Sequence, residues 1–242
     1  MKKNREIELN TREQRESTLW FQARRYRITS SLFGQVHRCK EQTPPDSLVL
    51  QILQQKQFTT PATQWGVSNE SRAREEYIQC QLTCGKDRLV VAPAGFFISK
   101  SQPFLGASLD GAVFDPSSPN HPFGFLEINC SFKHKNVTPQ EACRDPTFCC
   151  TYSNTAQQIM LKRTHPYFAQ VQGQMVIGNG PWCDFVIYTT KGIDVHRVQF
   201  DEDYWNLMLL PKLTTFCDNC VAPGIVSPVH VLGIPIPNLL NE

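Results

Sequence analysis

Leu105-Gly106-Ala107-Ser108-Leu109-Asp110-Gly111 and Gly124-Phe125-Leu126-Glu127-Ile128-Asn129-Cys130 are the two stretches that decide the fold. Each has the pattern of a β segment, and turn residues rich in Pro and Ser separate them. Each places one carboxylate, Asp110 or Glu127, among apolar residues, where an unpaired charge is costly. Buried carboxylates that converge in this way commonly hold a metal or perform acid–base chemistry.

Asp110-Gly111 has a second interpretation, because Asp-Gly is also the commonest hairpin-turn signal. A turn does not explain Glu127, which lies inside the apolar run Phe125–Ile128. That carboxylate is either on a solvated face or has a specific role. Residues two apart on a strand share a face, so we expect Asn129 beside Glu127.

Length and charge predict one domain with only local basic surface. The chain has 242 residues and a net charge of +2, and no low-complexity linker divides it. We expect a single domain over residues 1–225 and an irregular, Pro-rich tail over 226–242. Because the overall charge is nearly balanced, attraction to nucleic acid must come from local clusters. The N-terminal quarter holds such a cluster, made of Arg12, Arg15, Arg24, Arg25, Arg27, Arg38 and Lys40.

The sequence has neither a membrane-span pattern nor a secretory-signal pattern, and this bears on the compartment and on the state of the cysteines. No apolar run has the length of a membrane span, so we expect no membrane association. The polar start of the chain does not resemble a secretory signal, which predicts an intracellular protein without deciding between nucleus and cytoplasm. The ten cysteines are then expected as free thiols. Cys217-x-x-Cys220 lacks the second ligand pair of a structural zinc site.

Hydrophobic periodicity predicts an α/β protein with a mixed sheet. Strands are expected at residues 89–91, 95–99, 104–109, 111–114, 124–130, 183–189 and 193–200. Helices are expected at residues 11–27, 31–36, 46–55, 65–77, 166–178 and 201–220. Thr138-Pro139-Gln140-Glu141 has a capping-box pattern, and a loop of roughly fifteen residues is expected after it.

Five motifs occur in an order and spacing that resemble the YqaJ viral-recombinase family. This family comprises nucleases similar to lambda exonuclease, within the PD-(D/E)xK superfamily. The resemblance runs from about Leu19 to Trp205 and is greatest to animal or mobile-element members. It implies a restriction-endonuclease-like core, in which helices flank a central mixed β-sheet. The motifs are Arg27-Ile28-Thr29-Ser30-Ser31, Trp65-Gly66-x-x-Asn69-Glu70, Gly106-Ala107-Ser108-x-Asp110-Gly111, Leu126-Glu127-Ile128-x-Cys130 and Tyr167-x-x-Gln170-Val171-Gln172-Gly173-Gln174-Met175.

The resemblance implies a metal site and its cofactor. Asp110 and Glu127 would be the central ligands, joined by the main-chain carbonyl of Ile128. Glu70 would contact the metal directly or through water, and Gln170 would project into the same site. The implied ion is Mg²⁺, with Mn²⁺ as an alternative, and it would polarise a phosphoryl oxygen and activate a water molecule.

The resemblance also implies a substrate and partners. Arg27 would hold a DNA phosphate at a 5′ end, with Thr29, Ser30 and Ser31 adding donors from a helix start. The implied reaction is the metal-assisted hydrolysis of DNA from duplex ends, processively and 5′ to 3′. Family members often pair with a single-strand annealing protein, and the phage prototype is a ring-shaped trimer.

One departure from the family pattern affects the expected activity. The family has Leu-Glu-x-Lys-Cys-Pro, whereas this chain has Asn129 and Ser131 in place of Lys and Pro. An ammonium there would stabilise the developing phosphorane charge, while Asn can only hydrogen-bond and orient a water. The nuclease is either active with this substitution, or Lys133 or Lys135 supplies the missing charge.

Two other functions remain open at this point. A catalytically impaired protein could still bind DNA ends on the same fold, because Asn129 replaces the expected lysine; retention of Glu70, Asp110, Glu127 and Gln170 favours activity instead. A small-molecule phosphohydrolase would instead turn over nucleotides and have no affinity for duplex DNA. We favour the nuclease, because a decayed site would more often have lost a metal ligand.

Overall fold

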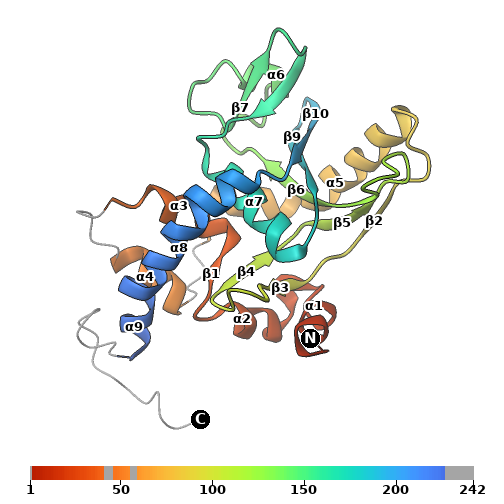
Figure 1. Ribbon diagram of the computed structural model, residues 1–242. Coiled ribbons are helices and arrows are strands. Elements are labelled where there is room, and N and C mark those ends of the chain that lie inside the picture. Colours follow the sequence, from red (N-terminus) through yellow and green to blue (C-terminus); the bar gives the residue numbers. More distant parts are fainter. Residues whose placement is uncertain (1, 41–45, 55–58, 227–242) are drawn as a thin grey trace.

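A five-stranded mixed sheet forms the centre of the computed structural model, which describes residues 2–40, 46–54 and 59–226 (Figure 1). Its strand order is β10-β9-β6-β5-β2. Strands β6 and β9 are parallel, and the other neighbouring pairs are antiparallel. The expected mixed sheet is therefore confirmed. The strands are β2 (Val90–Ala92), β5 (Gly111–Phe114), β6 (Phe123–Cys130), β9 (Trp182–Thr189) and β10 (Gly192–Gln199).

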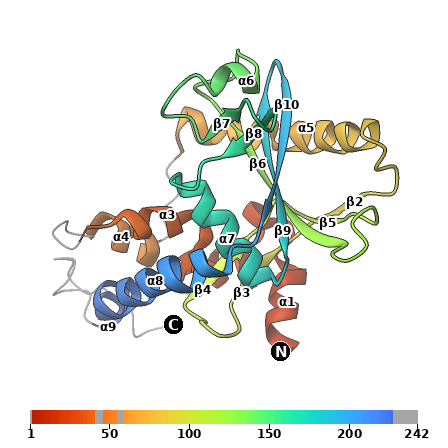
Figure 2. The same ribbon diagram turned by 45° about the horizontal axis from the view of Figure 1, so that its top comes forward.

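Helices α5 (Pro61–Thr83) and α7 (Pro166–Gly178) cover opposite faces of this sheet (Figures 1 and 2). On the α5 side, Tyr77 packs in one apolar cluster with Leu126 and Val186. On the α7 side, Phe125 belongs to a second and larger cluster. Because successive side chains of β6 point to opposite faces of the sheet, Leu126 faces α5, whereas Phe125 and Glu127 face α7.

A second, three-stranded sheet determines where Asp110 lies. Its order is β1-β4-β3, formed by β1 (Ile28–Thr29), β3 (Phe96–Ile98) and β4 (Leu105–Ser108). Strands β4 and β5 belong to different sheets, so Asp110-Gly111 joins the two sheets and does not close a hairpin between paired strands. The turn interpretation of Asp110 is therefore wrong.

The N-terminal helices differ from the single helix expected at residues 11–27. The structure has α1 (Lys2–Asn10), a short 3₁₀ helix (Gln14–Glu16) and α2 (Thr18–Arg24). The expected helix is interrupted because the Ser17 side chain caps α2 by accepting a hydrogen bond from the Trp20 N–H. Trp20 is buried as expected, but Tyr26 is 37 % exposed and lies beyond the helix end.

Helix α3 (Ser30–Arg38) packs closely against α7, and α4 (Asp46–Gln54) follows it. A Cβ atom on Gly34 would lie 2.4 Å from Pro166 Cα, and one on Gly173 would lie 2.2 Å from the Phe33 ring. Both helices were expected, although position 55 lies outside the described residues. In α5, Ala73 and Tyr77 are buried, whereas Val67 is 46 % exposed.

The loop expected after residue 141 is instead a β-hairpin. Helix α6 (Pro139–Ala142) has the expected capping box. Strands β7 (Cys150–Ser153) and β8 (Gln158–Leu161) then pair antiparallel and project beyond the main sheet (Figure 1). The hairpin forms because Cys150, Ile159 and Leu161 are buried, and the Leu161 N–H donates to His196 Nδ1 of β10.

The C-terminal helix is longer than expected and partly π-helical. It comprises η2 (Tyr204–Leu209), α8 (Leu210–Phe216), η3 (Cys217–Val221) and α9 (Ala222–Val226). Its buried face is formed by Trp205, Leu209, Leu213 and Phe216. The irregular tail was expected over residues 226–242; Val226 is helical, and the rest of that segment lies outside the described residues. Among the described helices, none is long and apolar enough to span a bilayer.

Candidate active site

Backbone hydrogen bonds bring Asp110 against the strand that carries Glu127. Asp110 Oδ2 accepts a hydrogen bond from the Ile128 N–H at 2.6 Å, and the Asp110 N–H donates to the Leu126 carbonyl. Asp110 is thus fixed to the residues on both sides of Glu127. The Glu127 side chain projects from the α7 face of β6 and is 8 % exposed. The two carboxylates expected to converge therefore lie together.

The pair is buried and electrostatically unfavourable as it stands. Burial raises the pKa of Asp110 to about 7, and the charge of Glu70 contributes to this shift. Burial and then the charge of Asp110 raise the pKa of Glu127 well above its usual value. Since like charges in a dry site repel, a bound cation would stabilise both ionised forms.

Two glutamines of α7 bind the Glu127 carboxylate. Gln170 Nε2 donates to Oε1 at 2.6 Å, and Gln174 Nε2 donates to Oε2, also at 2.6 Å. Gln174 also donates to the Ser108 carbonyl at 2.9 Å. Gln170 was expected in the site, whereas Gln174 was not assigned to it. Its i, i+4 spacing from Gln170 was the signal, because that spacing puts both amides on one helix face.

Glu70 reaches the same site from α5 and is paired with a cation. Arg74 Nη2 donates to Glu70 Oε1 at 3.0 Å and to the Asp110 carbonyl at 2.7 Å. Arg74 therefore links α5 to the segment that carries Asp110. The sequence analysis missed Arg74, although its i, i+4 spacing from Glu70 is a signal that could have identified it.

The chemistry of these donors fits a hard divalent cation. Within the described ranges, no three His, Cys, Asp or Glu side chains are close enough together to form a metal site on their own. Mg²⁺ needs only one or two carboxylates, because water and substrate oxygens complete its coordination. Asp110 and Glu127 supply that pair, and Ile128 lines the same groove. The buried pair with raised pKa values is what such a cation would stabilise.

Asn129 lies beside Glu127, as expected, and each of the two nearby lysines has another partner. Asn129 is 9 % exposed and lies near the Tyr167 hydroxyl, whose pKa is raised by burial and lowered slightly by Asn129. Lys133 Nζ lies 2.6 Å from Asp145 Oδ2, and Lys135 Nζ lies 4.2 Å from the centre of the Phe132 ring. Both ammonium groups therefore have partners away from Asp110 and Glu127.

A groove of about 790 Å³ contains this constellation. We call it the active-site groove; Glu70, Asp110, Glu127, Asn129 and Gln170 all line it. It adjoins a cavity of about 720 Å³, which we call the arginine cavity. Arg15 and Ser31 line both spaces, so the two are continuous.

The arginine cavity has a buried cation in its wall. Arg24 Nη1 donates to Ser108 Oγ at 3.1 Å, and its guanidinium lies 4.1 Å from the centre of the Trp20 ring. Burial, together with the positive charge of Arg15, lowers the pKa of Arg24 to about 10. Two guanidinium groups in one cavity favour an anionic occupant such as a phosphate.

Arg27, the expected phosphate contact, is not among the residues that line either space. Arg27 Nε donates to the Pro103 carbonyl at 2.9 Å, and Nη1 donates to the Ala23 carbonyl at 2.7 Å. Thr29 and Ser31 line the arginine cavity, whereas Ser30 is buried. The role of Arg27 stays a prediction, and Arg15 and Arg24 are the guanidinium groups beside the groove.

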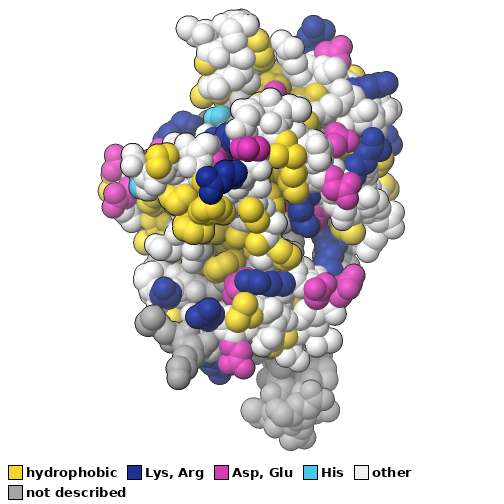
Figure 3. All heavy atoms as spheres, turned by 90° about the vertical axis from the view of Figure 1, so that its right-hand side faces the viewer, with side chains coloured by type: hydrophobic (Ala, Val, Ile, Leu, Met, Phe, Trp, Pro, Cys, Tyr) yellow, Lys and Arg dark blue, Asp and Glu magenta, His cyan; other side chains and the backbone are white. Residues whose placement is uncertain are grey.

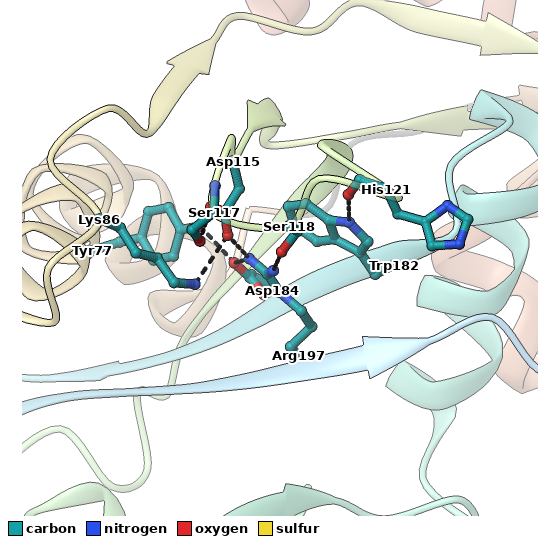
Figure 4. A network of polar contacts seen from close by, with 9 residues as sticks. All are labelled: Tyr77, Lys86, Asp115, Ser117, Ser118, His121, Trp182, Asp184 and Arg197. Atoms are coloured by element: carbon teal, nitrogen blue, oxygen red, sulfur yellow. Dashed lines mark hydrogen bonds and ion pairs between the residues drawn. The ribbon is translucent and has the colours of Figure 1, made fainter.

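A network of ion pairs behind the site anchors α5 to the sheet (Figure 4). The Tyr77 hydroxyl donates to Asp184 Oδ2 at 2.6 Å, and Arg197 pairs with Asp184 at 2.8 Å. Arg197 also pairs with Asp115 at 2.9 Å, and Lys86 pairs with Asp115 at 3.0 Å. Because α5 also carries Glu70 and Arg74, the network helps to hold them at the groove.

Comparison with known proteins identifies similar molecules. The model of the YqaJ-like viral recombinase domain matches residues 19–181, whereas no curated protein matches the sequence. The alkaline exonuclease LHK-Exo from Laribacter hongkongensis, solved with dAMP, has a TM-score of 0.64 and 21 % identity over 87 % of this chain and 95 % of its own. A SOX–DNA complex has a TM-score of 0.57 and 15 % identity, and the match covers 93 % of this chain and 72 % of the SOX chain. SOX from Kaposi's sarcoma-associated herpesvirus bound to RNA has the same TM-score and identity. These likenesses show the fold.

Proposed function

We propose that this chain, which belongs to the YqaJ-like viral recombinase domain family, is a metal-dependent DNA nuclease acting 5′ to 3′ on duplex ends. The observation that carries the proposal is the buried Asp110–Glu127 pair, whose pKa values are raised, in a groove continuous with the arginine cavity. Carboxylates that attract a cation beside guanidinium groups that attract a phosphate fit phosphodiester hydrolysis. The structural likeness to alkaline exonucleases supports the same conclusion.

In this proposal each residue of the groove has a separate role. Asp110 and Glu127 hold Mg²⁺ or Mn²⁺, which, when bound, polarises a phosphoryl oxygen and lowers the pKa of a water. The Ile128 N–H keeps Asp110 oriented. Gln170 and Gln174 each donate to one oxygen of Glu127, which fixes the plane of its carboxylate. Their amides stay neutral, so they orient the carboxylate and leave its charge for the cation.

Asn129 takes the place of the expected lysine and gives the water a hydrogen-bond partner. Its amide can both accept and donate a hydrogen bond, so it can orient the attacking water. It provides no positive charge for the transition state, and we therefore expect slower cleavage than a lysine would give.

The phosphate at the DNA end binds in the arginine cavity. Arg15 and Arg24 contribute positive charge there, and Ser31 contributes a hydroxyl. Because this cavity adjoins the groove, a phosphate bound in it places the next phosphodiester near Asp110 and Glu127. Association with a single-strand annealing protein and assembly into a ring-shaped trimer are further proposals, which rest on the family resemblance.

A second candidate function is a DNA-end-binding module that does not cut, and Asn129 is the observation that favours it. Digestion of linear duplex DNA with a 5′ phosphate distinguishes the two functions. We expect products in Mg²⁺ or Mn²⁺, none in EDTA, and none from Asp110→Ala. Closed circular DNA should stay intact, because the proposed enzyme requires an end. Bound but uncut linear DNA would instead support the binding module.

A further inference from the structure

A second basic cavity lies at the other end of helix α3. It has a volume of about 410 Å³ and its lining includes His37, Arg38, Arg163, His165, Tyr204 and Met208. We call it the distal pocket. None of these six residues lines the arginine cavity, and the function proposed above uses none of them.

The distal pocket continues the active-site groove along α3. His165 and Pro166, at the start of α7, line both spaces. Along α3, Ser31 and Gln35 line the groove, and His37 and Arg38 line the distal pocket. The seven residue steps from Ser31 to Arg38 cover about 10 Å of helix axis. That length matches about three nucleotides at the 3.4 Å rise per strand of B-DNA.

The pocket has a net positive charge. Arg38 Nη2 donates to the Thr164 carbonyl at 2.7 Å, and Arg163 Nη1 lies 2.5 Å from Asp201 Oδ2. Each guanidinium has five N–H donors, so both retain donors for a phosphate. The carboxylate of Asp201 compensates only one of these two charges. An anionic ligand is therefore favoured.

Two further lysines add to this positive charge. Burial, and then the charges of Lys212 and Arg38, lower the pKa of His37. Burial, and then the charges of Arg38 and Lys162, lower the pKa of His165 to about 4. The positive charges of Arg38, Lys162 and Lys212 therefore act on the two imidazoles of the pocket wall.

The wall also presents surfaces suited to a sugar or base. Met208 is 52 % exposed, and the His37 and Tyr204 rings lie 5.8 Å apart between centroids. His37 Nδ1 is buried and has no hydrogen-bond partner among the described residues. A polar group buried without a partner is costly, and a ligand donor or acceptor would relieve that cost.

We propose that the distal pocket binds the same DNA strand beyond the scissile phosphate, with Arg38 and Arg163 contacting a backbone phosphate and Met208 contacting a sugar or base. The proposal rests on the proposed function, because it assigns the strand that enters at the arginine cavity. A mononucleotide is too short to reach the distal pocket, whereas an oligonucleotide longer than about three residues reaches it.

Substitutions of Met208 test this without breaking a hydrogen bond. Binding of thymidine 5′-monophosphate and of 5′-phosphorylated dT4 and dT8 is measured in EDTA, which prevents hydrolysis. We expect Met208→Glu to weaken dT8 binding by about 3–10-fold and Met208→Lys to strengthen it by about 2–5-fold, since phosphate binding is largely electrostatic. Neither variant should change binding of the monophosphate. Leu207→Glu is the matched control, because Leu207 is 74 % exposed and is not among the residues that line the pocket.

The arginines give a second, independent measurement. The affinity for dT8 is measured at several salt concentrations, and log affinity is plotted against log salt concentration. In Arg38→Ala and in Arg163→Ala, the magnitude of the slope should be smaller than in the wild type by about 0.7, the value for one lost single-strand phosphate contact. Arg88→Ala removes the same charge from the exposed segment between α5 and β2 and should leave the slope unchanged. Circular dichroism of each variant establishes that it is folded.

The outcomes separate this proposal from the proposed function. Equal weakening by Met208→Glu and Leu207→Glu, or equal weakening of the monophosphate and dT8 by Met208→Glu, would overturn the distal subsite. If wild-type protein binds dT8 and Arg24→Ala weakens that binding, while the distal variants do not, only the subsite fails. If wild-type protein binds neither dT8 nor 5′-phosphorylated linear duplex DNA, the proposed function fails as well.

Discussion

At the scale of single residues, Glu127 has neutral amide donors on both carboxylate oxygens, from Gln170 and Gln174. Asn129, where the family pattern has lysine, adds no charge. The carboxylate is therefore well oriented but electrostatically unsatisfied, as its raised pKa shows. Its orientation and its charge can consequently be tested by separate substitutions.

Gln174→Leu tests the orientation of Glu127. Removing one of its two donors should lower metal affinity and cleavage rate by about 10–100-fold, the usual effect of losing a partner of a metal ligand. Metal titration by calorimetry and a single-turnover rate measure the two effects. Gln172→Leu is the control on the same helix, because Gln172 bonds the Gln199 carbonyl and the Asp201 N–H instead. Equal metal affinity in the two variants would contradict the role given to Gln174.

Asn129→Lys tests the missing charge. An ammonium beside Glu127 should raise the single-turnover cleavage rate by about tenfold or more, because it stabilises charge that develops in the transition state. Asn129→Met is the control, since it adds similar length without charge. If Asn129→Lys and Asn129→Met cleave at the same rate, the absence of a positive charge at position 129 does not slow cleavage.

At the scale of elements, hydrophobic periodicity predicted β5, β6, β9 and α7 to within about one residue. It failed for α1, whose sequence has little apolar character. It also failed for β7–β8, because each strand has only four residues, too few to show a clear alternating pattern. Hydrophobic periodicity reveals the buried face of a helix or strand only where the element is long enough to bury several of its residues.

The site was predictable to the extent that its residues belong to local motifs. Asp110, Glu127, Gln170 and Glu70 were all placed in the groove from their motifs. Arg24 and Arg27 lie within one turn of chain, and only tertiary packing decides which of them lines the cavity. The contact between Arg74 and Asp110 was not predictable, because the Asp110 carbonyl lies 36 positions away in sequence.

The close contact of α3 with α7 gives an expectation for stability. Gly34→Ala should reduce the free energy of unfolding by about 1–3 kcal/mol, because the new methyl group would overlap the Pro166 backbone. Gly66→Ala is the matched helical control. A Cβ there meets no atom within 4 Å, so the better helix propensity of Ala should add about 0.5–1 kcal/mol. Urea denaturation measures both, and similar effects of both variants would contradict the packing described.

The anchor between α5 and the sheet gives a second matched pair. Tyr77→Phe should cost about 1–3 kcal/mol, because it leaves Asp184 without the hydroxyl that donates to it. The buried Tyr188 hydroxyl has no partner among the described residues, so Tyr188→Phe should be neutral or stabilising. Thermal unfolding compares the two variants. A larger loss from Tyr188→Phe would show that the network does not anchor α5.

At the scale of the whole molecule, attraction to DNA must be local. The net charge is only +2, and the face in Figure 3 mixes Lys and Arg side chains with Asp and Glu. Three connected spaces, the arginine cavity, the active-site groove and the distal pocket, follow α3 and contain arginines at both ends. The fold thus concentrates positive charge on either side of a buried carboxylate pair.

Nucleotide release from 5′-phosphorylated linear duplex DNA, measured under single-turnover conditions, tests the central claim most directly. With Mg²⁺ or Mn²⁺, wild-type protein should release nucleotides at a rate that saturates with metal concentration and vanishes in EDTA. Asp110→Ala should lower that rate by more than about a hundredfold, because it removes a ligand and not merely a partner of one. Equal release by Asp110→Ala, or no release by wild-type protein that binds the duplex, would contradict a metal-dependent nuclease centred on Asp110 and Glu127.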